Sequence, residues 1–321
     1  MSRARLLYTL VLLLLISVPL LGIYPVFMMK LLCFAMFACA FNLLLGFSGM
    51  LSFGHAAFFG TAAYATGWLV AVHGSSTLTA LLAGVLVSGL LGLLIGALAI
   101  RRQGIYFAMI TLALAQLVYF VCLQAPFTGG ENGLQGIPRG RLLGVLPLSS
   151  DLTMYYVVLT AFVAQYLFIR RVVHSPYGQI LKAIRENETR AVSLGYEISR
   201  FKLLAFVLSA ALAGLAGALK ALVLGFVTLS DVLQANSGEV VLMTLVGGAG
   251  TFSGPVIGAA IVVTLQEYLS DRVGGWVTVI LGAVFVACVL MFRHGIVGEL
   301  QAWRQRRLCA RLPMSGPDNA P

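Results

Sequence analysis

Long apolar runs constrain the fold of this chain more than any other feature of its sequence. Hydrophobic residues make up 60% of the 321 residues and charged residues only 10%, which is too much apolar surface for a soluble domain. A helix needs about 20 apolar residues to cross a bilayer. The predicted fold class is therefore all-α, a polytopic transmembrane helical bundle. The runs long enough to span are 6–23, 26–46, 55–73, 77–100, 105–124, 153–171, 203–225 and 276–293.

A further apolar stretch, 238–269, is interrupted by the sequence GGAGTFSGP. One crossing through this stretch would place the basic C-terminal tail outside, although Lys and Arg concentrate on cytoplasmic segments. We therefore expect broken or re-entrant helices here. The predicted arrangement is two shorter elements, Glu239–Val246 and Pro255–Tyr268, or a re-entrant hairpin.

Basic residues also predict the orientation of the chain. Arg3 and Arg5 place the N-terminus in the cytoplasm. Successive crossings then place the loop 125–152 outside and the insert 172–202 inside, with the C-terminus also cytoplasmic. Residues 1–312 are expected to form one multi-pass domain, and residues 313–321 are expected to be disordered. The net charge of +10 follows from this orientation and does not indicate nucleic-acid binding.

Two glycine-broken segments, 46–65 and 247–261, combine Gly, Ser or Thr and an aromatic residue in a short loop before a small-residue helix. Such breaks at corresponding points of two halves indicate a transport path, whereas the alternative is two tight turns between helices. For His55, the alternative to path lining is a buried side chain bonded to a neighbouring carbonyl. The candidate path residues are Ser48, Ser52, His55, Thr111, Gln116, Thr251 and Ser253.

Small residues recur every four positions in two runs. Gly84, Ser88, Gly92 and Gly96 form one stripe, and Ala210, Gly214 and Ala218 form another. Because small side chains let helix backbones approach closely in lipid, we assign both stripes to helix packing.

The insert HSPYGQILKAIRENETRAVSLGYEISRFK, 174–202, carries the highest charge density in the chain. Ser175-Pro176 is a helix-start signal and Gly195 a stop signal. An apolar face beside mixed charges favours docking into a groove on a protein partner, although a helix lying on lipid headgroups is the alternative. The apolar face is predicted to contain Ile180, Leu181, Ile184, Ala191 and Leu194.

The segment 175–219, with GFSGMLSFGHAAFFGTAAY, GIYFAMITLALAQ, TGGENGLQGIP and GGAGTFSGPVIGAA, resembles the LivM-type permeases of branched-chain amino acid ABC transporters, in the LivH/LivM permease family. The resemblance implies a pore subunit with a homologous second permease, two cytoplasmic ATP-binding subunits and a periplasmic substrate-binding protein. It also implies that the insert is a cytoplasmic coupling helix and that the chain lies in a bacterial inner membrane. The residues assigned to ATPase coupling are Arg185, Asn187, Glu188, Ala191, Leu194 and Gly195.

The sequence is compatible with a pore subunit whose ATP is bound and hydrolysed by separate subunits. The chain has no G-x-x-x-x-G-K-[ST] sequence to cradle nucleotide phosphates, so it is predicted to be a transporter pore and not an enzyme. Its five cysteines show no CxxC pair, and neither a catalytic set, a cofactor nor a metal is predicted. The glycine-rich outer loop is a candidate docking surface for the binding protein, or an ordinary solvent loop. Its candidate residues are Thr128, Gly129, Gly130, Glu131 and Arg139.

Three alternatives to the branched-chain amino acid pore stay open. One is an ion-coupled secondary transporter of a small polar solute, which would need ionisable groups deep in the membrane. Another is an ABC permease for related small amino acids, urea or amides. The last is an intramembrane enzyme, for which the sequence shows no polar pair at matched spacing.

Overall fold

The computed structural model describes residues 15, 17, 24–142, 146–148, 150–291 and 295–299. Apart from residues 15 and 17, the predicted first span and the C-terminal tail lie outside this part of the chain. The all-α prediction is confirmed, and five helices are long and apolar enough to cross a membrane. The helices are α2 (Pro25–Asn42), α3 (His55–Ala71), α4 (Thr77–Ala99), α5 (Ile105–Gln124), α6 (Asp151–His174), α7 (Pro176–Glu186), α8 (Glu188–Ser193), α9 (Ile198–Leu224), α10 (Gln234–Gly247), α11 (Gly254–Val273) and α12 (Val277–Met291).

Short elements complete the connections. A π-helical segment, η2 (Leu43–Ser48), continues α2. Two small antiparallel pairs join β1 (Leu134–Gln135) to β4 (Phe226–Val227) and β2 (Arg141–Leu142) to β3 (Leu146–Pro147). The 3-10 turns are η3 (Pro126–Thr128), η4 (Gly130–Asn132), η5 (Leu229–Asp231) and η6 (Gly274–Trp276).

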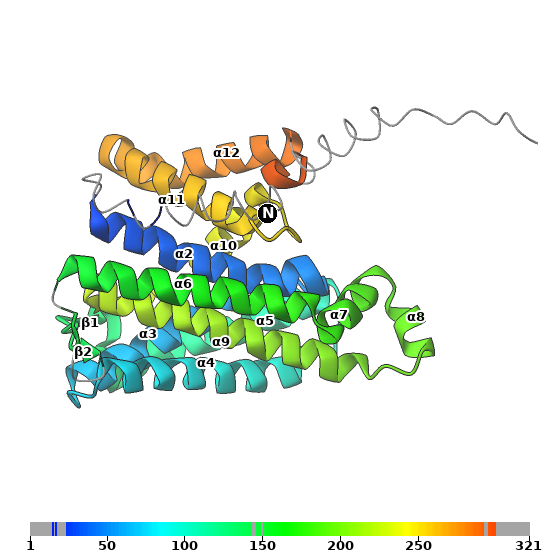
Figure 1. Cartoon of the computed structure of the whole chain (residues 1–321), viewed down its shortest axis with the longest axis horizontal. Coiled ribbons are helices and arrows are strands. Elements are labelled where there is room, and N and C mark those ends of the chain that lie inside the picture. Colours follow the sequence, from blue (N-terminus) through cyan, green and yellow to red (C-terminus); the bar gives the residue numbers. More distant parts are fainter. Residues whose placement is uncertain are drawn as a thin grey trace, which may run out of the picture.

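The long helices run side by side and give the molecule two ends (Figure 1). The strands β1 and β2 lie at one end, which we call the loop end, and α7 and α8 protrude at the other, which we call the insert end. The turn between α4 and α5 belongs to the insert end, because the amide Nε2 of Gln103 donates to a carboxylate oxygen of Glu188 at 2.6 Å. The loop end is closed by a hydrogen bond from the amide of Ile137 to the carbonyl of Gly225, 2.9 Å.

The interrupted stretch 238–269 forms two helices, α10 and α11, so the prediction of two shorter elements is confirmed. Both helices extend beyond the predicted bounds. They pack so closely that a Cβ added at Gly258 would lie 1.8 Å from the carbonyl oxygen of Met243, and one at Gly247 would lie 1.9 Å from that of Gly254. Glycine is required at both positions because any side chain would push the hairpin apart.

The two small-residue stripes, which were assigned to helix packing, pack against each other. A Cβ added at Gly92 would lie 2.5 Å from the Cβ of Ala210, and one at Gly214 would lie 1.9 Å from the hydroxyl oxygen of Ser88. Close contact of this kind gains dispersion energy that lipid chains do not supply. The α4–α9 contact thus fixes one side of the bundle, and α9 also packs on α2 and α3.

The insert departs from the single helix that the capping signals predicted. Its start is confirmed, because the hydroxyl of Ser175 accepts a hydrogen bond from the amide of Gly178 at 3.4 Å. Asn187, however, is extended (φ −155°, ψ 100°) and its side chain accepts from the amide of Arg190 at 2.9 Å. An asparagine in this conformation caps a new helix, which divides the insert into α7 and α8. Gly195 ends the second helix with φ +85°, as predicted.

Candidate functional site

The two glycine-broken segments, far apart in sequence, meet at the insert end of α2. The side-chain amide of Asn42 donates to the carbonyl of Thr251 at 2.9 Å, and its oxygen accepts from the amide of Gly250 at 2.9 Å. The contact leaves no room for side chains, since a Cβ added at Gly46 would lie 2.5 Å from the nitrogen of Gly250. The two segments are therefore in direct contact. Asn42, which bridges them, was not among the predicted residues.

Arg185 of α7 reaches into this contact. Its guanidinium Nη1 donates to the carbonyl of Gly46, and its Cγ passes within 3.0 Å of the position that a Cβ would occupy at Gly49. Gly49 and Gly250 both have positive φ, +74° and +83°. Residues other than glycine disfavour this backbone conformation. Three glycines thus form a cradle for one arginine, and α7 is joined to both glycine segments.

Aromatic contacts reinforce this junction. The rings of Phe47 and Phe252, one from each glycine segment, lie 5.3 Å apart. The ring of His174, at the end of α6, stacks on Phe252 at 5.1 Å, and the ammonium of Lys182 lies 5.9 Å from the centre of the Phe47 ring. The base of the insert is therefore packed on the same two loops that Arg185 binds.

The second insert helix, α8, is held on the bundle by polar and apolar contacts. The carboxylate of Glu188 pairs with the ammonium of Lys202 at 2.7 Å and accepts from Gln103. Ala191 is buried against Ile184 and Ile198. Two of the predicted coupling residues, Glu188 and Ala191, thus attach α8 to the rest of the chain.

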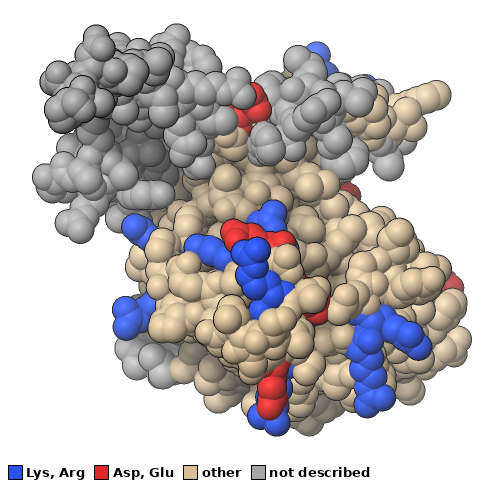
Figure 2. Space-filling view, turned by 90° about the vertical axis from the view of Figure 1, so that its right-hand side faces the viewer, with Lys and Arg blue, Asp and Glu red and all other residues tan. Residues whose placement is uncertain are grey.

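The opposite side of α8 is open. Val192 in α8 is 59% exposed, and Leu194, the C-cap residue directly after the helix, is 69% exposed. Leu194 was predicted to share one apolar face with Ile184 and Ala191, but those two side chains are buried whereas Leu194 is exposed, because the break at Asn187 turns α8 away from the direction of α7. Among the described residues, a Cβ added at Gly195 would meet nothing within 4 Å. Figure 2 looks onto the insert end and shows basic and a few acidic side chains scattered over an otherwise uncharged surface.

A partly buried tyrosine connects α7 to α9. The hydroxyl of Tyr177 donates to the carbonyl of Phe201 at 2.9 Å, and the two rings stack with centres 5.8 Å apart. Burial raises the pKa of Tyr177 above the usual tyrosine value, so the hydroxyl keeps its proton and remains a donor at neutral pH.

His55, at the start of α3, is fully buried. Its Nε2 lies 2.9 Å from the hydroxyl of Ser209, which itself donates to the carbonyl of Ala40 at 2.6 Å. Because that hydroxyl proton is used, Nε2 is the donor to Ser209. Among the residues that the structure describes, Nδ1 is a buried acceptor without a partner. Edge-on rings of Phe41 and Phe58 flank the imidazole. The sequence analysis gave a histidine bonded to a neighbouring carbonyl as the alternative to path lining. In the structure, Ser209 stands between His55 and the carbonyl of Ala40.

The other predicted path residues satisfy backbone groups close to themselves. Ser48 donates to Leu44 at 2.6 Å, and Thr111 donates to Ala108 at 2.9 Å. The hydroxyl of Ser52 accepts from Gly54 at 3.2 Å. Thr251 donates to the carbonyl of Gly248 at 2.8 Å and accepts from the amide of Gly254 at 3.1 Å. Gln116 and Ser253 are partly buried, in α5 and just before α11.

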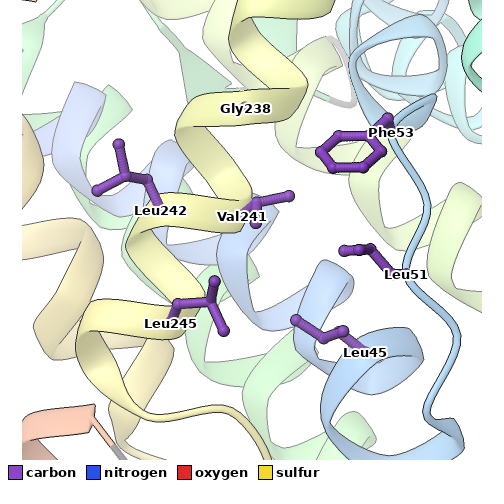
Figure 3. Close-up of a pocket in the computed structure, with 7 residues that line it drawn as sticks. All are labelled: Leu45, Leu51, Phe53, Gly238, Val241, Leu242 and Leu245. Carbon is purple, nitrogen blue, oxygen red and sulfur yellow. The ribbon is translucent and has the colours of Figure 1, made fainter. Parts of the chain in front are cut away.

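A pocket of about 420 Å³ lies beside the first glycine segment (Figure 3). In the close-up, side chains from η2 and the following loop face α10 across it. None of the seven predicted path residues lines it. Polar side chains were the signal used to find a path, and this pocket has none in its lining. The lining residues are Leu45, Leu51, Phe53, Gly238, Val241, Leu242 and Leu245.

At the loop end, the candidate docking residues divide into two groups. Thr128 is buried and donates to the carbonyl of Ala125 at 2.7 Å. Arg139 pairs with Asp151 and donates to the carbonyl of Val223 at 3.1 Å. Gly129 and Glu131 are exposed, and Gly130 is partly buried. Thr128 and Arg139 therefore hold the loop in its shape, whereas Glu131 presents an exposed charge.

A buried ion pair lies under the same loop. The ammonium of Lys220 in α9 binds both carboxylate oxygens of Asp231, at 2.6 and 2.7 Å. Asp231 also accepts from the amide of Thr228 at 3.1 Å. Each charge is therefore paired, and the pair fixes the segment between α9 and α10.

The chain is similar in sequence to known transport proteins. Residues 26–289 match the family described as branched-chain amino acid transport system / permease component. The chain is 29% identical over 299 residues to the high-affinity branched-chain amino acid transport system permease protein LivM of Salmonella typhimurium, covering 86% of this chain and 67% of the relative. The figures for LivM of Escherichia coli are the same. A probable LivM of Methanocaldococcus jannaschii is 24% identical over 196 residues, covering 59% of this chain and 56% of that protein. No solved structure matches the chain.

Proposed function

The chain belongs to the family of permease components of branched-chain amino acid transport systems, and from this premise we propose that it is the membrane pore subunit of an ABC importer for branched-chain amino acids. The proposal includes a homologous second permease that completes the pore. It also includes two ATP-binding subunits at the insert end and a substrate-binding protein at the loop end.

One observation supports the proposed contact with the ATP-binding subunits: the two sides of α8 have different surroundings. One side is fixed to the bundle through Glu188 and Ala191, and the other presents Val192 and Leu194 to the surroundings. Exposed aliphatic groups next to charges of both signs suit a groove on a protein. Acidic residues would weaken attachment to anionic lipid headgroups, so a lipid-bound helix is the less favoured alternative.

The same geometry supports a cytoplasmic position for the insert end. Arg101 and Arg102 are in the turn between α4 and α5, and Arg170 and Arg171 are in the last turns of α6. Both places are at the insert end, and basic residues concentrate on the cytoplasmic side of bacterial inner-membrane proteins. Both termini are cytoplasmic in this proposal.

The transport test uses the whole complex in proteoliposomes. Leucine uptake is expected to require ATP, both ATP-binding subunits and the binding protein. Uptake by this chain alone, driven by a proton gradient, would instead establish an ion-coupled secondary transporter and refute the proposal.

The docking test compares two aspartate variants. Leu194→Asp adds a charge to the open side of α8, whereas Val72→Asp adds the same charge to an aliphatic side chain that is 59% exposed at the end of α3. Burying an unpaired carboxylate at an interface is strongly unfavourable. We expect Leu194→Asp to release the ATP-binding subunits during purification and Val72→Asp to retain them. Retention in both variants would show that α8 is not the contact.

A further inference from the structure

We propose that Asn42 is a positioning residue for transport. It joins the first glycine segment (46–65) and the second (247–261) into one unit, which α7 moves through Arg185. The inference rests on the proposed function, because it takes the ATP-binding subunits to be what moves the insert. It adds the residue that passes this movement on to the second glycine segment.

Asn42 binds the second glycine segment with both polar atoms of its side chain. It is 3% exposed, its amide nitrogen donates to the carbonyl of Thr251, and its oxygen accepts from the amide of Gly250, each at 2.9 Å. The first segment lies against the same side chain, since a Cβ added at Gly46 would lie 2.1 Å from the Asn42 oxygen. Asn42 therefore holds the two segments together from within their contact.

Arg185 contacts both segments but is bonded to the first. Its Nη1 donates to the carbonyl of Gly46, and the same atom lies 3.2 Å from the position that a Cβ would occupy at Gly250. The hydrogen bond of Arg185 thus goes to the first segment, whereas the hydrogen bonds of Asn42 go to the second. A movement of α7 that pulls on Gly46 is passed to the second segment through Asn42.

The second segment connects this movement to two helices. Gly250 and Thr251 lie between the end of α10 at Gly247 and the start of α11 at Gly254. The two helices are held together at this point, because a Cβ added at Gly247 would lie 1.9 Å from the carbonyl oxygen of Gly254. A displacement of the loop therefore carries α10 and α11 together. Coupling between distant sites requires a connected element of this kind.

A buried amide could also serve only to stabilise the fold, and Gln165 provides the matched control for that role. Gln165 in α6 is also 3% exposed, and its amide nitrogen donates to the carbonyl of Met36 in α2 at 2.9 Å. This bond includes neither glycine segment. Asn42→Leu and Gln165→Leu each replace a buried amide by an aliphatic side chain of similar size and leave a backbone carbonyl without its donor.

The two variants are compared in the whole complex in proteoliposomes, by the number of leucine molecules taken up per ATP hydrolysed. We expect this ratio to fall about tenfold in Asn42→Leu, the scale of losing two neutral hydrogen bonds, and to be retained in Gln165→Leu. The double variant of Asn42→Leu with Arg185→Ala should have the same ratio as Arg185→Ala alone, because both interrupt one connection.

Three results of this comparison would overturn the inference: an unchanged ratio in Asn42→Leu, an equal fall in Gln165→Leu, or losses that add in the double variant. An unaltered complex without ATP-dependent leucine uptake would refute the proposed function instead.

A crosslink between the two segments tests the inference without changing Asn42. The rings of Phe47 and Phe252 have centres 5.3 Å apart, so Phe47→Cys with Phe252→Cys can be joined by a short, reducible reagent with two thiosulfonate groups. Because the segments move together, the crosslink should leave leucine uptake intact. In the Asn42→Leu chain it replaces the missing bridge and should restore the ratio until it is reduced.

The chain without the two introduced cysteines, treated with the same reagent, is the control for its native thiols. Arrest of uptake by the crosslink, relieved on reduction, would show that the segments separate during transport and would contradict the inference. A crosslink that leaves the low ratio of Asn42→Leu unchanged would contradict it as well.

Discussion

The close contact between α4 and α9 allows a quantitative prediction from two glycines three residues apart on one helix. A Cβ added at Gly92 would lie 2.5 Å from the Cβ of Ala210, whereas one added at Gly89 would lie 3.7 Å from the Cβ of Ala211. Carbon atoms in contact prefer a separation of about 3.5–4.0 Å. Gly92→Ala therefore forces the helices apart by roughly 1 Å, and Gly89→Ala does not.

The energies follow from these distances. Inserting a group into a well-packed contact costs about 1–3 kcal/mol. Replacing glycine by alanine in a helix gains up to about 1 kcal/mol, and this gain applies to both variants. The free energy of unfolding of Gly92→Ala should therefore be lower than that of Gly89→Ala by about 1–3 kcal/mol.

Unfolding of the purified chain in mixed micelles, followed by circular dichroism as denaturing detergent is added, measures this difference. Gly89→Ala is expected to be as stable as the unaltered chain or slightly more stable. Equal stability of the two variants would refute the assignment of the Gly84, Ser88, Gly92 and Gly96 stripe to close packing.

Three further predictions concern the charged contacts. Arg185→Ala leaves the Gly46 carbonyl without its donor and should lower the amino acid transported per ATP hydrolysed while the ATP-binding subunits still co-purify; an unchanged ratio would exclude a role in coupling. Glu188→Lys places two cations together at Lys202, so α8 should detach and become sensitive to protease, with membrane insertion intact; resistance to protease and full uptake would contradict this. Asp231→Asn leaves Lys220 buried without its counter-charge, at a cost of about 3–5 kcal/mol in the free energy of unfolding. The double variant with Lys220→Met should recover part of that loss, and a single variant as stable as the double would show that the ion pair is not required.

The sequence predicted the membrane helices well because their signal is additive over many residues. The run 105–124 coincides with α5 (Ile105–Gln124), and the glycines before Pro255 marked the break between α10 and α11. Apolar length and glycine interruptions are properties of a local segment, so neither required knowledge of tertiary contacts.

The insert was predicted less well because one residue decides its shape. The apolar spacing continues past Asn187, so the insert was predicted to be a single helix. The sequence did carry a signal for the break, since asparagine favours the N-cap and Glu188 follows it in the first turn. Leu194 was placed on the same apolar face as Ile184 and Ala191 for the same reason, but it is exposed whereas they are buried.

The pocket could not be predicted from polar residues. Ser48, Ser52 and Thr111 use their hydroxyl groups locally, as most serines and threonines in membrane helices do. The lining side chains have the same composition as ordinary core or lipid-facing positions, and only the three-dimensional contact between α10 and the first glycine segment places them around one space.

The central claim is that the open side of α8 is held by an ATP-binding subunit, and photocrosslinking from position 194 tests it most directly. A photoreactive amino acid replaces Leu194 in membranes containing the whole complex, and the same amino acid at Val72 serves as the control from the loop end. Our account predicts a crosslink from position 194 to an ATP-binding subunit, and none to that subunit from position 72. Crosslinks from position 194 to phospholipid alone would contradict it.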